Sequence, residues 1–281
     1  MAAPVSALVP ENNLRLPDAL TVRYGPAPLL SRFILEADKV ARAAGIYLRL
    51  RNDFDTLTWL NEQQVAQGTW YPLIDMFNPE RADVSPANAF WLSGENERGE
   101  IVCTNAARIF SWHDTNLEEQ AVAMMYGRND GQPCVITADA AKTISGIVQC
   151  HGATWVHPDY RSRGLSHLLP RVCRAYGPSR WPIDYVMALI TMKHYNAGIA
   201  FSYGARHFSP SVFYPGHHLP EMVLAYSSRD EIYDDLETYL ANELSNASDG
   251  KFASRSVSTF LAQEVINTSP DAVRHGSSRR S

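Results

Sequence analysis

The sequence has few cysteines, and none of them lie close together. Its 281 residues include only Cys103, Cys134, Cys150 and Cys173, with no pair in the CxxC spacing. Zinc knuckles and dense disulfide frameworks need closely spaced cysteines, so the sequence indicates neither. We expect the four thiols to be reduced and to lie in the core.

Long hydrophobic runs are also missing. No run approaches the about 20 residues that a bilayer-spanning helix needs. Residues 1–4, MAAP, do not show the basic and then apolar segments of a secretory leader. These two absences predict a cytoplasmic protein with no membrane partner.

A strong positive charge and the common nucleotide motifs are absent as well. The formal net charge is −5, so we expect no broad basic face and no nucleic-acid partner. The sequence contains no GxxxxGKS/T, GxGxxG or GxSxG motif, which argues against P-loop hydrolases, Rossmann dehydrogenases and serine hydrolases with a nucleophile elbow. Nor does any histidine spacing fit a metal site, so we expect no metal; the histidines considered are His157, His194, His207, His217 and His218.

What the sequence does contain is an ordinary globular composition, with 45% hydrophobic and 20% charged residues. Hydrophobic periodicity predicts helices at 31–44, 54–66, 117–125, 165–176, 196–203 and 230–244. It predicts strands at 46–50, 90–93, 101–112, 144–156, 185–190, 211–214 and 222–226. An early hairpin followed by β-α-β units predicts an α/β (mixed α+β) fold, with helices on both faces of one mixed sheet.

The same reading predicts one domain over residues 29–244. An extended arm precedes it at residues 1–28, and a polar, loosely ordered tail follows it at residues 245–281. The acidic helix at 230–244 is most simply a solvated flank of the sheet. A homodimer contact is the alternative interpretation of that helix.

One segment indicates chemistry. Residues 156–166, VHPDYRSRGLS, join an apolar predicted strand to the start of a predicted helix. Such a junction exposes backbone N–H groups at the positive end of the helix dipole, and Arg161 and Arg163 add charge. Gly164 lets an anion approach the backbone closely. The segment therefore predicts a binding site for a pyrophosphate.

The segment resembles the acyl-CoA loop of the GNAT N-acetyltransferase superfamily, whose pattern is Arg/Gln-x-x-Gly-x-Gly/Ala. Arg161, Gly164 and Ser166 occupy its three positions, with serine replacing the usual final residue. A second match follows downstream, where Asn196, Tyr203 and Phe208 reproduce the family's Asn–Tyr–aromatic spacing. His207 stands where the family usually has glycine.

The resemblance implies a GNAT-like, mostly antiparallel twisted sheet in which two central parallel strands splay apart. Those strands would be 144–156 and 185–190, with the pantetheine arm between them. The implied reaction moves acetyl from acetyl-CoA to a primary amine by direct attack in a ternary complex. The implied cofactor contacts are Trp155 and Val156 for the thioester arm, Arg161, Ser162, Arg163, Gly164, Leu165 and Ser166 for the diphosphate, and Asn196 for the CoA arm.

The motifs specify the catalytic residues less fully than the cofactor contacts. Tyr203 is the candidate general acid, because a phenol is protonated at neutral pH; an ordinary core tyrosine is the alternative. Cys150 and Gly152 stand where the family often places its base, so His151 between them is the candidate, and a water relay to Glu95 or Glu100 is another.

Two other functions stay open. An acyl-CoA-binding sensor or interaction module without catalysis would explain the missing base. A transferase for longer acyl groups or aminoacyl donors would explain the aromatic segment from Trp70 to Phe77, which we expect to roof an active site.

Overall fold

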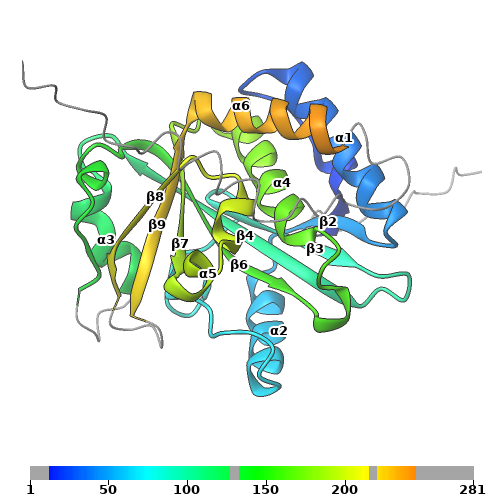
Figure 1. Ribbon diagram of the computed structural model, residues 1–281, viewed down its shortest axis with the longest axis horizontal. Helices are drawn as coiled ribbons and strands as arrows, with labels where there is room; N and C mark the ends of the chain where they lie inside the picture. The colour runs from blue at the N-terminus through cyan, green and yellow to red at the C-terminus, as the bar shows by residue number, and fades with distance from the viewer. Residues whose placement is uncertain (1–12, 127–132, 215–219, 245–281) are drawn as a thin grey trace, which may run out of the picture.

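A single twisted sheet runs through the molecule. The computed structural model describes residues 13–126, 133–214 and 220–244. Within them, nine strands pair in the order β1-β2-β3-β4-β6-β7-β9-β8-β5 (Figure 1). The strands are β1 Asn13–Arg15, β2 Tyr47–Arg51, β3 Ala89–Glu95, β4 Ile101–Trp112, β5 Val135–Ile136, β6 Gly146–Val156, β7 Tyr185–Thr191, β8 His207–Phe213 and β9 Glu221–Ser228.

Helices cover both faces of this sheet. On one face α1, α4 and α6 pack over a core that includes Phe33, Leu169 and Leu236. On the other face α2, α3 and the segment around Phe77 enclose a second core, and Figure 1 shows α2 on the side away from α1 and α6. The helices are α1 Ala27–Ala43, α2 Phe54–Ala66, α3 Leu117–Tyr126, α4 Leu165–Arg180, α5 Met192–Asn196 and α6 Arg229–Tyr239.

Local sequence signals explain where several elements end. Helix α1 buries a stripe with helical spacing and stops before Gly45, whose φ is +74°. The N–H of Gly45 bonds to the carbonyl of Arg42 and that of Ile46 to the carbonyl of Ala41, which is a Schellman cap. Helix α2 and strand β4 have the predicted bounds.

Several elements differ from the sequence-based expectations, among them the strand predicted at 211–214, which is β8 from His207 to Phe213. Residues 13–15, within the predicted arm, form β1 on the edge of β2, and residues 1–12 lie outside the described part. The predicted helix 196–203 consists of two short helices, α5 and the 3₁₀ helix η5 Ile199–Tyr203, because Gly198 has a φ of +73° between them. Strand β5 was not predicted, and the predicted tail at 245–281 lies outside the described residues.

All four cysteines are buried and form no disulfide bond, as the sequence predicted. Burial raises the pKa of Cys103, Cys134 and Cys150 to about 12. These thiols therefore stay protonated at neutral pH and are poor nucleophiles. Among the helices of the described ranges, none has both the length and the apolar character required to cross a membrane.

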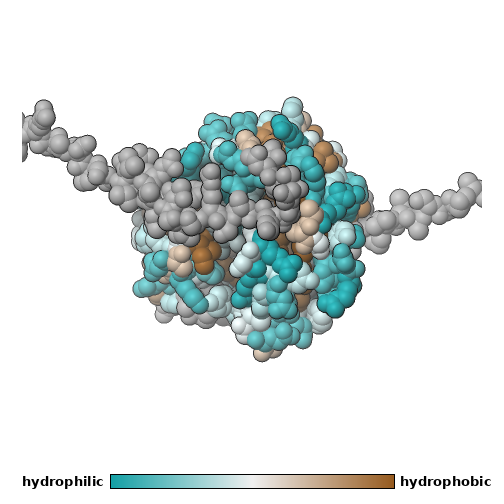
Figure 2. Space-filling view, turned by 45° about the vertical axis from the view of Figure 1, so that its right-hand side comes forward, coloured by the Kyte–Doolittle hydropathy of each residue, from teal (hydrophilic) through white to brown (hydrophobic). Residues whose placement is uncertain are grey.

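The surface on the side shown in Figure 2 is mainly hydrophilic, with hydrophobic residues in small patches. Large exposed apolar side chains are scattered over different elements; they include Leu35 on α1, Trp59 on α2 and Phe213 on β8. Scattered apolar residues of this kind are normal for a globular protein and mark no site by themselves.

The parallel pair at the centre of the sheet is incomplete. Strands β6 and β7 pair only from Val148–His151 to Tyr185–Ala188. Beyond that point β6 continues to Val156 beside β4, and β7 continues to Thr191 beside β9. The predicted α/β fold, a mostly antiparallel sheet with central parallel strands that splay apart, is therefore confirmed.

Candidate functional site

A bulge shapes β6 where it leaves β7. Gly152 pairs with Ala106 and Trp155 with Thr104, so Ala153 and Thr154 together face the single residue Asn105. Ala153 takes a φ of +49° in this bulge. The hydroxyl of Thr104 donates to the Ala153 carbonyl at 2.8 Å, and the Asn105 amide donates to the Thr154 hydroxyl at 2.5 Å. Side chains of β4 thus fix the bulge.

Two cavities meet beside the bulge. The smaller one, 160 Å³, lies between the diverging strands, and the larger one, 610 Å³, runs along the segment that follows β6. Five residues line both cavities: Trp70, Tyr71, Thr154, His194 and Tyr203. A ligand could therefore extend from one cavity into the other past these residues. Trp70 and Tyr71 belong to the aromatic segment that the sequence predicts as a roof.

The segment after β6 presents free backbone donors to the larger cavity. The Arg161 N–H bonds to the Pro158 carbonyl, and helix α4 takes its first bonds at His167 and Leu168. From Ser162 to Ser166, no backbone N–H has a hydrogen-bond partner among the described residues. Ser162 and Gly164 have φ values of +60° and +74°. Backbone N–H groups in such a turn at a helix N-terminus form a concave anion site.

The two arginines of this segment make other contacts. Arg161 donates through Nε to the Val156 carbonyl at 3.1 Å and through Nη2 to the Thr69 carbonyl at 3.2 Å. Arg163 donates to the Asp159 carbonyl, and its guanidinium lies 4.6 Å from the Tyr160 ring centroid. Arg161 lines the larger cavity and Arg163 does not. These two hydrogen bonds of Arg161 hold the segment around Thr69 against the end of β6.

The other residues predicted to contact the cofactor differ in whether they line a cavity. Trp155, Val156, Leu165 and Ser166 line the larger cavity. Trp155 stacks on Trp70 with ring centroids 5.4 Å apart, and its indole N–H is buried without a partner among the described residues. Asn196, at the end of α5, is exposed and lines neither cavity.

Tyr203 lies where the two cavities join. Burial raises the pKa of its phenol to about 12, so the group is protonated at neutral pH and able to donate. The loop that carries it is held by Arg174, which donates to the backbone carbonyls of Tyr203 and Gly204. A Cβ at Gly204 would stand 2.5 Å from the Arg174 guanidinium, so only glycine fits there.

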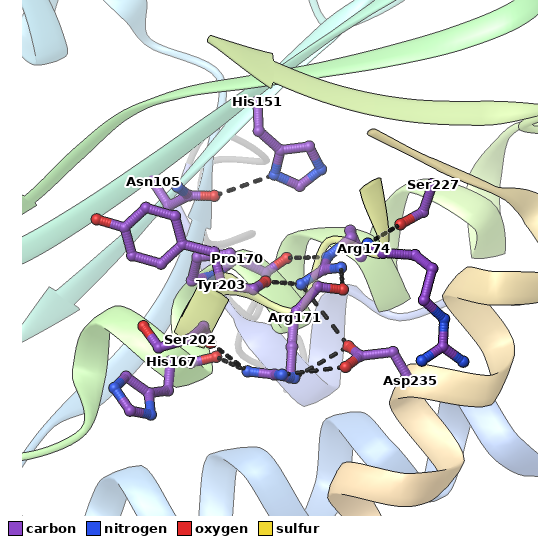
Figure 3. Close-up of polar contacts among 12 residues, drawn as sticks. Asn105, His151, His167, Pro170, Arg171, Arg174, Ser202, Tyr203, Ser227 and Asp235 are labelled. Atoms are coloured by element: carbon purple, nitrogen blue, oxygen red, sulfur yellow. Dashed lines mark hydrogen bonds and ion pairs between the residues drawn. The ribbon is translucent and has the colours of Figure 1, made fainter. Parts of the chain in front are cut away.

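Arg174 belongs to a buried cluster that sequence reasoning missed. Arg171 binds both oxygens of Asp235 at 3.0 Å and also donates to the Ser202 carbonyl. Arg174 lies 3.7 Å from the same carboxylate, and burial lowers its pKa to about 10, which leaves it charged at neutral pH. Figure 3 shows both arginines between Asp235 of α6 and the Ser202–Tyr203 turn. The cluster thus joins α4, α6 and η5.

His151, the predicted base, has both ring nitrogens engaged. Nε2 lies 2.8 Å from the Gln149 amide nitrogen, which also donates to the Cys173 carbonyl. Nδ1 lies 3.4 Å from the Asn105 side-chain oxygen, a contact that Figure 3 shows. Burial, and then the charge of Arg174, hold the pKa of His151 well below its usual range. The ring is therefore neutral, with its lone pair directed at Gln149. This geometry gives no support to His151 as the base.

The carboxylates of the predicted water relay lie elsewhere. Glu95 is paired with Arg49 and Arg51, and Glu100 with Arg98. Neither residue lines either cavity. The described residues contain no group of three or more His, Cys, Asp or Glu that could hold a metal ion; His217 and His218 lie outside them.

His194 is the histidine that shares both cavities with Tyr203. It follows Thr191, the last residue of β7, whose hydroxyl caps α5 by accepting from the His194 N–H. Burial, and then Lys193, lower the pKa of its imidazole. The sequence could have indicated His194 as a site residue by its position just beyond the carboxyl end of a parallel strand, because ligands bind there in α/β sheets.

The buried cluster generates a prediction about stability. Asp235→Asn leaves Arg171 and Arg174 without their counter-charge, so we expect the free energy of unfolding to fall by about 2–4 kcal/mol. Asp234→Asn is the matched control, because Asp234 is exposed on the same helix; its effect should stay within about 0.5 kcal/mol. Urea unfolding measures both variants. Equal effects of the two substitutions would show that the cluster contributes nothing.

Comparisons with known proteins give structural likeness only. Neither protein-family models nor curated sequences match the chain. Similar solved structures include FeeM, an N-acyl amino acid synthase from uncultured soil microbes, with 15% identity, TM-score 0.43 and coverage of 66% of this chain and 93% of that one. Arabidopsis thaliana NAA60 in complex with acetyl-CoA shows 16% identity, TM-score 0.42 and coverage of 65% and 99%.

A third similar structure is the aminoglycoside acetyltransferase AAC(6')-Ib in complex with coenzyme A and kanamycin. It has 13% identity and a TM-score of 0.36, and the match covers 67% of this chain and 98% of that one. The structures similar to this chain thus include an N-acyl amino acid synthase, a protein in complex with acetyl-CoA and an acetyltransferase in complex with coenzyme A.

Proposed function

We propose that the protein is an acyl-CoA-dependent N-acyltransferase that transfers an acyl group, acetyl in the simplest case, to a primary amine. The observation that supports this most is the placement of the unbonded N–H groups from Ser162 to Ser166. Four of these five residues, Ser162, Gly164, Leu165 and Ser166, line the same 610 Å³ cavity as Tyr203, beside the point where β6 leaves β7. One elongated ligand with an anionic end and a reactive end fits this arrangement.

Coenzyme A has these features. Its diphosphate would accept from the N–H groups at the start of α4, with the helix dipole adding attraction. Its pantetheine amides would lie along β6 from Thr154 to Val156, beyond the point where β7 stops pairing with the strand. The unpartnered indole N–H of Trp155 is a further donor in this region.

The thioester would then lie near Tyr203 and His194. The neutral amine attacks the thioester carbon, the C–S bond breaks, and the sulfur leaves as a thiolate that takes a proton from the Tyr203 phenol. His194, neutral because its pKa is lowered, takes the proton that the amine loses. An acyl-enzyme is not part of this scheme, because Cys150 is buried with a pKa of about 12.

An acyl-CoA-binding protein without transferase activity is the second candidate. It is favoured by His151, which has no free lone pair. Stabilisation by CoA without thiol release on a broad amine panel would distinguish this function from transfer.

Binding of CoA is the first test. We expect millimolar acetyl-CoA to raise the melting temperature, since a ligand that binds only the folded state stabilises it. S-acetylpantetheine, which lacks the nucleotide and the diphosphate, should bind at least about tenfold more weakly, because charge-assisted bonds to the N–H groups are lost. Thermal shift measures both ligands.

Gly164→Ala should weaken acetyl-CoA binding by placing a methyl group in the anion site. Gly99→Ala is its control, because Gly99 has a similar φ of +76° in a hairpin with open space around it. If acetyl-CoA fails to stabilise the wild-type protein, the proposed function is wrong.

Tyr203→Phe should lower the turnover number by about 10²–10⁴-fold, the usual contribution of a general acid. Binding of acetyl-CoA should change little, because only the hydroxyl is removed. Tyr195→Phe is the control, since Tyr195 lines neither cavity and packs on Phe201 and Phe208. Free-thiol release over an amine panel is the measurement. An unchanged turnover number in Tyr203→Phe would remove the phenol from the mechanism.

The role of His194 predicts a pH dependence. The pKa of His194 is lowered from 6.5, so its imidazole is neutral at higher pH and becomes protonated, and therefore unable to act as a base, as the pH falls. A plot of the logarithm of the rate against pH should therefore show a further downward bend below pH 6.5. His194→Gln should abolish this bend and lower the rate by about 10²-fold. His113→Gln, on an exposed turn, is the control. Persistence of the bend in His194→Gln would assign it to another group.

A further inference from the structure

The smaller cavity extends past the proposed thioester position. It begins at Thr154, where the cavities join, and reaches His151, the last residue of β6 that pairs with β7. Three residues of strand span about 10 Å. This space lies on the side of the junction away from the anion-binding segment, so a chain attached to the thioester carbonyl would enter it directly.

Small side chains create this space. Ala188 of β7 and Ala225 of β9 are directly opposite each other and both line the cavity. The next pairs along the two strands carry a larger side chain on at least one side, Val186 with Ser227 and Ile190 with Val223. Met187, Leu189 and Met222, whose side chains point to the other face of the sheet, also line the cavity and are apolar. Two facing alanines thus leave room that larger residues would fill.

Away from the five residues that line both cavities, the polar side chains of the smaller cavity already have partners. His151 is bonded to Gln149 and Asn105, and Arg174 to backbone carbonyls. The Ser227 hydroxyl accepts from the Arg206 N–H. A polar or charged ligand would find few unpaired groups here and would lose its hydration. The interior therefore suits an apolar group.

The volume sets the size of that group. The cavity measures 160 Å³, whereas a single water needs roughly 15 Å³ and an apolar cavity of about 150 Å³ accepts benzene. The one methyl group of an acetyl donor would leave most of this space empty. A chain of about five carbons beyond the carbonyl would fill it.

We propose that the smaller cavity binds the acyl chain of the donor, and that the preferred donor is a medium-chain acyl-CoA of about six carbons. This inference rests on the proposed function and names the donor class for the same site. The acceptor amine enters elsewhere, because His194, which takes its proton, lies at the junction of the two cavities.

The experiment compares the binding of CoA, acetyl-CoA and hexanoyl-CoA by calorimetry. Each further buried methylene strengthens binding by about fourfold, so hexanoyl-CoA should bind at least about tenfold more tightly than acetyl-CoA. Ala188→Leu fills the cavity and should abolish this preference while leaving CoA binding unchanged. Ala225→Leu makes the same change from β9 and serves if the first variant does not fold. Ala197→Leu, on the exposed end of α5, is the matched control.

Each outcome decides the inference. Equal affinity for acetyl-CoA and hexanoyl-CoA in the wild-type protein overturns the acyl pocket but leaves the proposed function standing. Equal losses of CoA and hexanoyl-CoA in Ala188→Leu would mean that pantetheine fills the cavity, which also overturns it. If none of the three ligands binds, the proposed function itself fails. Loss of the hexanoyl preference in Ala188→Leu, but not in Ala197→Leu, supports the pocket.

Discussion

The parting of β6 from β7 is the constraint on which the candidate site depends. Parallel strands usually stay paired along their length, because each unpaired backbone group must find another partner. Here the β4 side chains of Thr104 and Asn105 hold a bulge that keeps the end of β6 beside β4, while β7 stays with β9. The opening is therefore built into the sheet before any ligand binds. Both cavities border this opening.

The buried arginine cluster provides the second fixed point. Two guanidinium groups and one carboxylate are costly to remove from water, and such groups are retained in a core only when hydrogen bonds satisfy them. Arg171 and Arg174 meet this condition by donating to carbonyls of the turn that carries Tyr203. The orientation of Tyr203 thus depends on Asp235 in α6, a helix that lines neither cavity. A substitution in α6 can act on the site through this contact.

The sequence predicted the parts of the fold that local signals determine. The periodicity of α2 and β4 placed their bounds correctly, and Gly45 marked the end of α1. The strand-to-helix segment at 156–166 was identified because glycine and anion-binding geometry are local features. Strands β1 and β5 were missed because two or three residues carry no periodic pattern. Arg171 and Asp235 are 64 residues apart, so no local pattern could pair them, and His194 needed the splayed strands to place it beside Tyr203.

The two cavities differ in chemistry in a way that one ligand can satisfy. The larger cavity offers unbonded N–H groups at a helix N-terminus, which favour an anion. Beyond the junction, the smaller cavity offers apolar walls and polar side chains that are already paired, which favour hydrocarbon. Tyr203 and His194 lie between these environments. Binding at both ends would hold the reactive centre of an acyl thioester against these two groups, so affinity for the distant parts of the donor would contribute to the rate by fixing the geometry of attack.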